Sequence, residues 1–121
     1  MEKIRASELR INNIVEADGI IQRVYRIWQN GAELVEQEDG DDDLDYHEND
    51  IHPIPLTEEW LLKFGFTKEV LGWKHWNLDL YLYLDNGCFE SEQLPMFIYL
   101  KYVHQLQNLY FALTNEELCI K

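Results

Sequence analysis

The residues whose types and spacing best suit chemistry are acidic, and they crowd into one short stretch. Its aspartates are Asp39, Asp41, Asp42, Asp43 and Asp45. The alternate spacing of Asp41, Asp43 and Asp45 matches the first half of a calcium-binding EF-hand loop, whose carboxylate oxygens bind the ion. Tyr46 and His52, however, stand where that loop requires glycine and glutamate. The stretch is therefore a weak candidate metal site, with a solvated acidic loop as the competing interpretation.

The same stretch dominates the charge of the chain. The 121 residues carry 23 acids and 10 bases, a net charge of −13. Nine of the acids lie between Glu36 and Asp50, where there is no lysine or arginine. Such a surface repels phosphate backbones, which argues against direct binding to DNA or RNA. If the carboxylates were held on a rigid face, they would instead imitate nucleic acid and occupy a protein that binds it.

Histidines and cysteines give no positive support for catalysis. The histidines are His47, His52, His75 and His104, and none lies three or four residues from another. Cys88 and Cys119 lack the spacing of metal ligands and are expected to be reduced thiols in a cytoplasmic protein. Without a paired nucleophile, a glycine-rich phosphate loop or a zinc pattern, we predict no catalytic residue and no cofactor.

Aromatic side chains are the better candidates for a functional surface. The interface candidates, chosen for their place on two-faced strands or on a polar or off-stripe helix face, are Trp28, Trp73, Tyr81, Tyr83, His104 and Phe111. Tryptophan and tyrosine are the residues that most often anchor protein interfaces. The alternative is that these rings form the core, because aromatic stripes usually indicate burial.

One stretch in the middle of the chain organises the elements that position these residues. Pro55 prevents a helix from starting before it. Thr57 then stands where a helix N-cap belongs, with its hydroxyl placed for a free backbone amide. Gly65 suits the left-handed residue that follows a helix, so that Phe66 would fold back on Leu61 in a Schellman motif. The stretch predicts a helix of about two turns and a boundary just before it.

Residues 1–55 are predicted to form an antiparallel β meander. Strands are expected at residues 14–17, 20–28 and 32–36. Xaa-Gly pairs at residues 18–19 and 30–31 mark the two hairpin turns between them. A further strand at residues 50–54 would close the meander into a small SH3-like barrel, with residues 36–50 as an exposed acidic loop before it.

Residues 56–121 are predicted to be an α-β-β-(β)-α-β half. The expected strands are residues 73–84, a return strand from residue 88, residues 96–100 and residues 118–120. The first of these is long for a strand, and Asn77 marks the place where it would break in two. One apolar stripe predicts a second helix over residues 101–113. Together the two halves predict an α+β fold with mainly antiparallel sheets.

Composition excludes several classes of protein. The hydrophobic content of 46% is that of a globular protein. No apolar run reaches the roughly 20 residues needed to span a membrane. The first residues lack the apolar core of a secretory signal, so a cytoplasmic location and no membrane association are expected.

Three stretches of the sequence resemble a family of small uncharacterised proteins found in bacterial and phage-related genomes. They are Leu-Arg-Ile-Asn-Asn-Ile-Val at residues 9–15, Pro-Ile-Pro-Leu-Thr-Glu-Glu-Trp-Leu-Leu-Lys-Phe-Gly-Phe at residues 53–66, and Lys-Tyr-Val-His-Gln-Leu-Gln-Asn-Leu-Tyr-Phe-Ala-Leu-Thr at residues 101–114. Asn12 and Asn115 stand where the family usually has glycine, and asparagine also tolerates left-handed geometry. The resemblance implies a bacterial or phage-related origin but no activity.

These observations leave three hypotheses open. The first is a non-enzymatic protein-binding or adaptor protein, whose partner is an unknown protein or a second copy of the chain. The second is an enzyme of unknown type, with a site between the two halves that uses His104 and Asp79. The third is an acidic nucleic-acid mimic. The aromatic candidates and the missing catalytic motifs favour the first.

Overall fold

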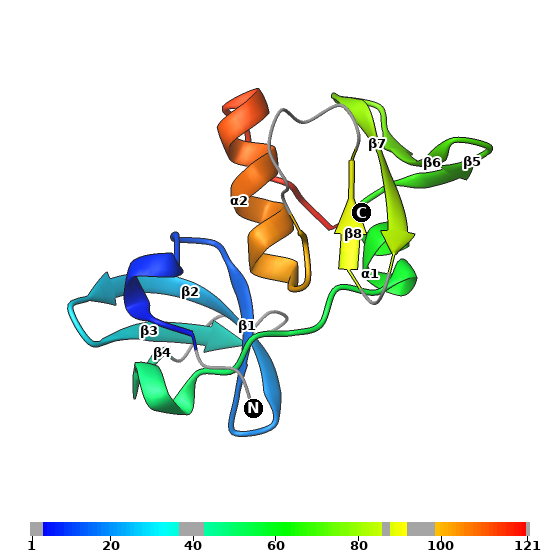
Figure 1. The fold of residues 1–121 in the computed structure, drawn as a ribbon. Coiled ribbons are helices and arrows are strands. Elements are labelled where there is room, and N and C mark those ends of the chain that lie inside the picture. Colours follow the sequence, from blue (N-terminus) through cyan, green and yellow to red (C-terminus); the bar gives the residue numbers. More distant parts are fainter. Residues whose placement is uncertain (1–3, 37–42, 86–87, 92–98, 121) are drawn as a thin grey trace. The chain divides into compact units, whose positions relative to one another are not determined.

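The computed structural model describes residues 4–36, 43–85, 88–91 and 99–120 (Figure 1). The chain has an α+β fold and divides into two compact units, unit 1 with residues 1–54 and unit 2 with residues 55–121. Unit 1 contains η1 (Ala6–Glu8), β1 (Ile14–Ala17), β2 (Ile20–Trp28), β3 (Gly31–Glu36), β4 (Asp43–His47) and η2 (Glu48–Asp50). Unit 2 contains α1 (Glu58–Lys63), β5 (Thr67–Glu69), β6 (Gly72–His75), β7 (Leu78–Asp85), β8 (Cys88–Glu90) and α2 (Val103–Thr114).

The sheet of unit 1 is the predicted meander with one more strand. Its order is β1-β2-β3-β4, with each strand antiparallel to the next. The predicted turn at Asp18 and Gly19 is confirmed, since both residues have positive φ, as a type I′ hairpin requires. The second turn lies one residue earlier than predicted, because Gly31 already pairs with Trp28. Gly31 is needed there because a Cβ would clash with the carbonyl oxygen of Tyr46.

Two predictions about the acidic stretch were wrong. The fourth strand is β4, inside the predicted loop, and it pairs with β3 from Gly31↔His47 to Val35↔Asp43. The segment at residues 50–54 contributes only an isolated bridge between His52 and Glu16, so the described residues form no closed SH3-like barrel. Pro53 explains this in part, because a residue without an amide hydrogen cannot extend the ladder.

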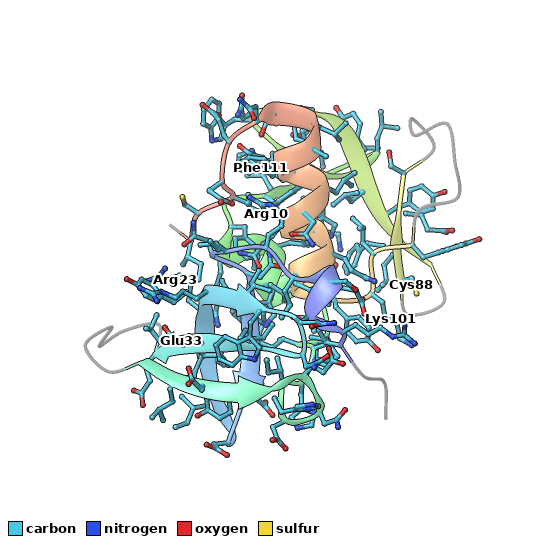
Figure 2. All side chains as sticks on the ribbon, turned by 90° about the vertical axis from the view of Figure 1, so that its left-hand side faces the viewer. Arg10, Arg23, Glu33, Cys88, Lys101 and Phe111 are labelled. Atoms are coloured by element: carbon cyan, nitrogen blue, oxygen red, sulfur yellow. The ribbon has the colours of Figure 1, made fainter. Side chains whose placement is uncertain are left out.

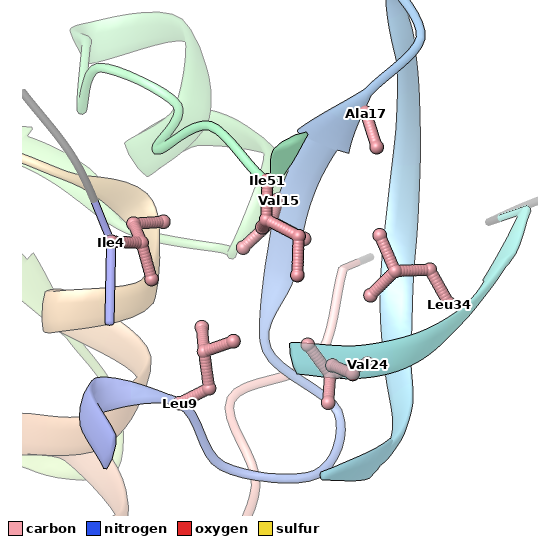
Figure 3. Close-up of a cluster of buried hydrophobic side chains, with 8 residues drawn as sticks. Ile4, Leu9, Val15, Ala17, Val24, Leu34 and Ile51 are labelled. Atoms are coloured by element: carbon pink, nitrogen blue, oxygen red, sulfur yellow. The ribbon is translucent and has the colours of Figure 1, made fainter. Parts of the chain in front are cut away.

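One face of this sheet carries the core of unit 1 (Figure 3). The buried cluster consists of Ile4, Leu9, Val15, Ala17, Val24, Ala32, Leu34 and Ile51. Figure 3 shows Leu9, the residue after η1, in one cluster with Val24 of β2 and Leu34 of β3. The opposite face of β2 does not line this core cluster.

Helix α1 begins and ends as predicted. The Thr57 hydroxyl accepts a hydrogen bond from the amide of Trp60 at 3.4 Å. Gly65 has φ +88°, and two bonds close the helix as a Schellman motif: Phe66 N–H to Leu61 O at 2.9 Å and Gly65 N–H to Leu62 O at 3.0 Å. Glycine is required at this position because left-handed geometry costs other residues about 1–2 kcal/mol. Asn115 plays the same part after α2, with φ +60°.

The sheet of unit 2 has the order β5-β6-β7-β8, again fully antiparallel. The long predicted strand does break at Asn77, and its two pieces, β6 and β7, fold back on each other as a hairpin. The prediction of a final strand at residues 118–120 was wrong, because these residues form no strand in either sheet. Most of the strand predicted at residues 96–100 lies outside the described residues, but Leu100 forms a bridge with Phe89.

Aromatic rings fill the interior of unit 2. Its buried rings are Trp60, Phe64, Phe66, Trp73, Phe89 and Tyr110. His75 is buried among them, with ring centres 5.0 Å from Phe66 and 5.1 Å from Tyr110. Its Nδ1 accepts the amide hydrogen of Asn77 at 3.1 Å, which fixes the β6–β7 turn.

Candidate functional site

The outer face of β2, opposite the core cluster, is the first candidate site. The strand carries a bulge between Val24 and Arg26, so that Tyr25 has no partner of its own in β3. The Arg26 guanidinium lies 5.6 Å from the centre of the Tyr25 ring, which places these two neighbours on the same side. The bulge therefore brings together side chains that strict alternation would separate. We call Tyr25, Arg26 and Trp28 the outer β2 row.

The members of the outer β2 row are exposed. Tyr25 is 44% exposed and Trp28 is 39% exposed, although both are large rings. Arg23 of β2 pairs with Ile14 of β1 and with Val35 of β3. Both partners are buried, so this face of the sheet is not open to solvent at that position. The open part of the face thus lies toward the β2–β3 turn.

Several contacts hold side chains of the outer face of β2, and Figure 2 labels Arg23 and Glu33, which take part in two of them. Arg26 lies 3.9 Å from the carboxylate of Glu33, its partner across the β2–β3 ladder. Arg23 donates a hydrogen bond to Asn12 Oδ1 at 2.9 Å. The indole of Trp28 lies over Gly31, where any side chain would meet it. A surface whose side chains are held before binding loses less conformational entropy when a partner arrives.

Acidic residues border the row on the side of β4. Glu33 faces Asp45 directly across the β3–β4 ladder, although like charges at such positions destabilise a sheet. Arg26 offsets this repulsion from the other side of Glu33. The local field is therefore negative beyond Arg26, in keeping with the nine acids between Glu36 and Asp50.

The pKa of Tyr46, on β4, is affected by these nearby acids. Its hydroxyl donates to Asp18 Oδ2 at 2.9 Å and accepts from Gln22 Nε2 at 3.4 Å. The Gln22 hydrogen bond lowers the pKa of Tyr46, but burial and the Asp18 carboxylate together raise it more. The pKa of Tyr46 consequently lies above its ordinary value.

A pocket in unit 2 is the second candidate site. It has a volume of about 600 Å³ and is lined by Leu56, Thr57, Glu58, Glu59, Leu84 and Phe89. We call it the α1 pocket. Leu84 and Phe89 are cross-strand partners in β7 and β8, so they present their side chains on the same face. Leu84 is 55% exposed and Phe89 is buried, which makes an apolar wall and an apolar floor.

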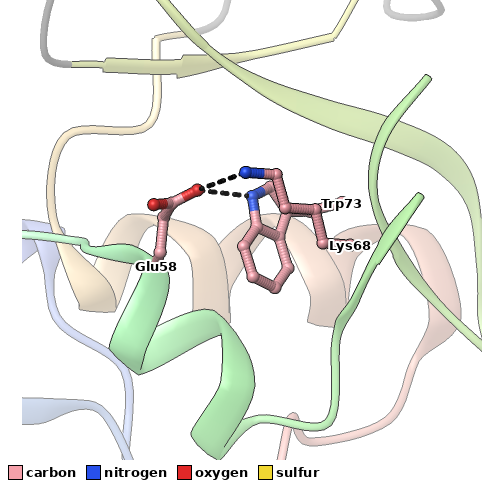
Figure 4. Close-up of polar contacts among 3 residues, drawn as sticks. All are labelled: Glu58, Lys68 and Trp73. Atoms are coloured by element: carbon pink, nitrogen blue, oxygen red, sulfur yellow. Dashed lines mark hydrogen bonds and ion pairs between the residues drawn. The ribbon is translucent and has the colours of Figure 1, made fainter. Parts of the chain in front are cut away.

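Glu58 is fixed at the edge of the α1 pocket (Figure 4). Its Oε2 accepts a hydrogen bond from Trp73 Nε1 at 3.1 Å and lies 3.7 Å from Lys68 Nζ. Glu59 makes no such contact among the described residues. The pocket therefore combines an apolar interior with one carboxylate that is already paired and one that is available.

The other predicted interface residues lie in unit 2, where they are buried or half-buried. Trp73 is 5% exposed, and its indole is engaged by Glu58. Tyr81, Tyr83 and Phe111 are half-buried. His104 is buried in α2 and stacks on Tyr102, with ring centres 6.0 Å apart. Of the predicted set, Trp28 alone is exposed, so the structure brings the set together in neither site.

The weak metal candidates are not drawn together either. Asp41 lies outside the described residues, whereas Asp43 and Asp45 belong to β4. In the part of the chain that the structure describes, no three His, Cys, Asp or Glu side chains gather closely enough to hold a metal ion. Asp45 instead lies opposite Glu33 in the β3–β4 ladder.

The residues of the enzyme hypothesis, His104 and Asp79, both belong to unit 2, on α2 and β7. The polar contacts that stand out in this unit join Asn77 Nδ2 to the Tyr110 hydroxyl at 3.0 Å and to Glu116 Oε2 at 2.6 Å. They tie the β6–β7 turn to the end of α2. We interpret these hydrogen bonds as structural, because the side chains of Asn77, Tyr110 and Glu116 bond to one another.

Sequence reasoning missed Tyr25 and Arg26 in the outer β2 row, and Leu84 and Phe89 in the α1 pocket. An alternating pattern assigns Tyr25 and Arg26 to opposite faces, and only the bulge unites them. No sequence signal announces a bulge without a glycine. The pocket joins residues about thirty positions apart, although Thr57 and the two glutamates after it did mark the helix end that forms its rim.

Comparison of the chain with protein-family models, with curated proteins and with solved structures found no match. Among the described helices, neither is long and apolar enough to cross a bilayer.

Proposed function

We propose that this chain is a non-enzymatic protein-binding module and that the outer β2 row is its interface. One observation carries the proposal. Unit 1 has three aromatic residues, Tyr25, Trp28 and Tyr46, and none of them is buried. In the described part of this unit the buried apolar side chains are all aliphatic. Tyr25 and Trp28 are thus exposed at the surface, whereas Tyr46 packs partly buried against the core cluster.

The composition of the row supports binding over mere solvation. Tyrosine, tryptophan and arginine are the three residue types most enriched at interface hot spots. Here they lie close together in one strand, with Arg26 paired to the Glu33 carboxylate and the Trp28 indole lying against Gly31. Rigid rings of this kind give large contact area at a low cost in side-chain entropy.

The charge around the row indicates the kind of partner. Glu33 and Asp45, which pair across the β3–β4 ladder, flank it on the β4 side. A protein surface with an apolar centre and a basic rim would complement both features. Association would then be fastest at low ionic strength, because long-range attraction between the surfaces is screened by salt.

A capture experiment with matched variants tests the proposal. The full chain, a Tyr25→Ala/Trp28→Ala double variant and a Trp76→Ala control are immobilised and exposed to extracts of the cells that encode the chain. Trp76 is a suitable control because it is 72% exposed and lies in unit 2. We expect a protein that the wild type and the control retain equally, that the double variant loses, and that salt releases.

Equal retention by all three proteins would contradict the proposal, as would retention that does not respond to salt. A captured band that consists of the chain itself would also contradict it, because the partner would then be a second copy. Folding of the double variant is checked by amide hydrogen exchange, which should be unchanged in the core strands.

A further inference from the structure

We infer that the α1 pocket is a separate recognition site, and that it accepts a short peptide segment with an aliphatic residue beside a lysine or arginine. The site lies entirely in unit 2 and shares no residue with the outer β2 row. The inference therefore stands whether or not the outer β2 row binds a protein.

The floor of the pocket is rigid because backbone pairing holds it. The amide of Leu56 donates to Lys101 O at 2.9 Å. Phe89 and Leu100 exchange two hydrogen bonds, at 2.9 and 2.8 Å. The start of α1 and strand β8 are thus both joined to the segment at residues 100–101. Two lining side chains, Leu56 and Phe89, are consequently fixed relative to each other.

The size and lining of the pocket select an amphipathic occupant over a bare ion. A volume of about 600 Å³ falls in the range of sites for ligands much larger than one ion. Leu56, Leu84 and Phe89 offer apolar surface that a hydrated ion would not use. An aliphatic side chain that covers the exposed part of Leu84 would gain from leaving water.

The rim selects a cation. Glu58 and Glu59 both lie in the first turn of α1, so the pocket edge carries two carboxylates. Lys68 and Trp73 already engage Glu58, which leaves Glu59 to attract an incoming charge. An anion is disfavoured by both carboxylates. The helix end offers it little in return, because Thr57 already accepts the amide of Trp60.

A peptide titration tests this inference on the full chain. The probe is a blocked pentapeptide with the central sequence lysine-leucine-lysine, and binding is followed by backbone amide chemical shifts. We expect the largest shifts at Glu59, Leu84 and Phe89. A glutamine-leucine-glutamine peptide should bind at least about threefold more weakly, since exposed ion pairs contribute modestly. Raising the salt should remove that difference.

Two variants and two matched controls locate the effect. Leu84→Ser should weaken binding at least about fivefold, because it removes the apolar wall. Leu62→Ser, at an equally exposed leucine outside the pocket, should not. Glu59→Gln should weaken binding by about two- to fivefold. Glu36→Gln, which removes one charge from unit 1, should leave it unchanged.

Three results would overturn the inference. The neutral and the basic peptide could bind equally well, or the shifts could map away from the pocket. Leu84→Ser could prove no weaker than Leu62→Ser. Hexylamine is titrated as a further probe, because it has an aliphatic chain and an ammonium group but no peptide backbone. If it bound as tightly as the lysine-leucine-lysine peptide, the occupant would be a small amine and the assignment to a peptide segment would be wrong.

Discussion

Unit 1 fills its core with aliphatic side chains and exposes Tyr25 and Trp28 to solvent, whereas the rings of Trp60, Phe64, Phe66, Trp73, Phe89 and Tyr110 are buried in unit 2. Trp28 and Trp73 illustrate the contrast, because both lie on strands of four-stranded antiparallel sheets. Trp28 projects from the uncovered face of β2. Trp73 is buried, with its indole bonded to Glu58. The same residue type is thus exposed in one unit and part of the core in the other.

The two candidate sites differ in the same way. The outer β2 row is a projecting surface built by a bulge, and the α1 pocket is a concavity between a helix start and a hairpin. Projecting rings suit the surface of another folded protein, while a concavity suits a side chain or a short segment. Exposed apolar groups therefore point to different kinds of partner according to the local shape.

The sharpest test of the contrast compares the two tryptophans by stability. Trp73→Ala should lower the free energy of unfolding of unit 2 by about 3–5 kcal/mol, because it removes a buried ring. Trp28→Ala should cost less than about 1 kcal/mol, as substitutions on the surface do. Urea denaturation with residue-resolved amide exchange measures each unit separately. Equal costs would mean that Trp28 is part of a core after all.

A pair of leucines extends the test to unit 1 alone. Leu34 and Leu44 are partners across the β3–β4 ladder, but Leu34 is buried and Leu44 is 58% exposed. Leu34→Ala should destabilise unit 1 by about 2–5 kcal/mol. Leu44→Ala should change the free energy by no more than about 0.5 kcal/mol. A large cost at Leu44 would show that β4 belongs to the core more than its exposure indicates.

Helix α1 gives a smaller effect that is specific to unit 2. Thr57→Ala should cost about 1 kcal/mol, since it removes the acceptor for the amide of Trp60. Thr57→Ser should restore most of that loss. Thr67→Ala is the control, because the Thr67 hydroxyl lies at an exposed position on β5 and caps no helix. The readout is the urea midpoint of unit 2; a loss at Thr67 as large as that at Thr57 would exclude a capping effect.

The smallest expected effect concerns Tyr46 and the acids near it. Because the folded pKa is raised, the neutral phenol is favoured in the folded state, so its stabilising contribution is complete below the unfolded pKa of about 10. That contribution is lost as the pH rises through the folded pKa. Asp18→Asn should move the phenolate titration of Tyr46 to lower pH, measured by absorbance against Tyr46→Phe. An unchanged titration would mean that Asp18 does not control it.

Sequence reasoning succeeded where the structure depends on neighbouring residues. Thr57 as a cap, Gly65 as the left-handed residue and the closure of Phe66 on Leu61 all lie within ten positions of one another. The same holds for the turn at residues 18–19. In these places one or two residues suffice to determine the backbone.

Reasoning failed where distant pairing overrides local preference. Asp43 and Asp45 have low strand propensity and carry like charges, yet both lie in β4, which pairs with β3. The break at Asn77 was predicted, but the pairing of its two pieces as a hairpin, which leaves Trp76 exposed, was not. Neither candidate site could be assembled from sequence, because one depends on a bulge and the other on the meeting of α1 with β7 and β8.

Site-specific photo-crosslinking can detect directly whether the outer β2 row contacts a partner protein, as we propose. A photo-reactive phenylalanine analogue is placed at position 25 or, as a control, at position 76 of the full chain inside the cells that encode it. We expect one discrete adduct with another protein from position 25, which is absent from position 76. Identical adducts from both positions, or none from position 25, would contradict it.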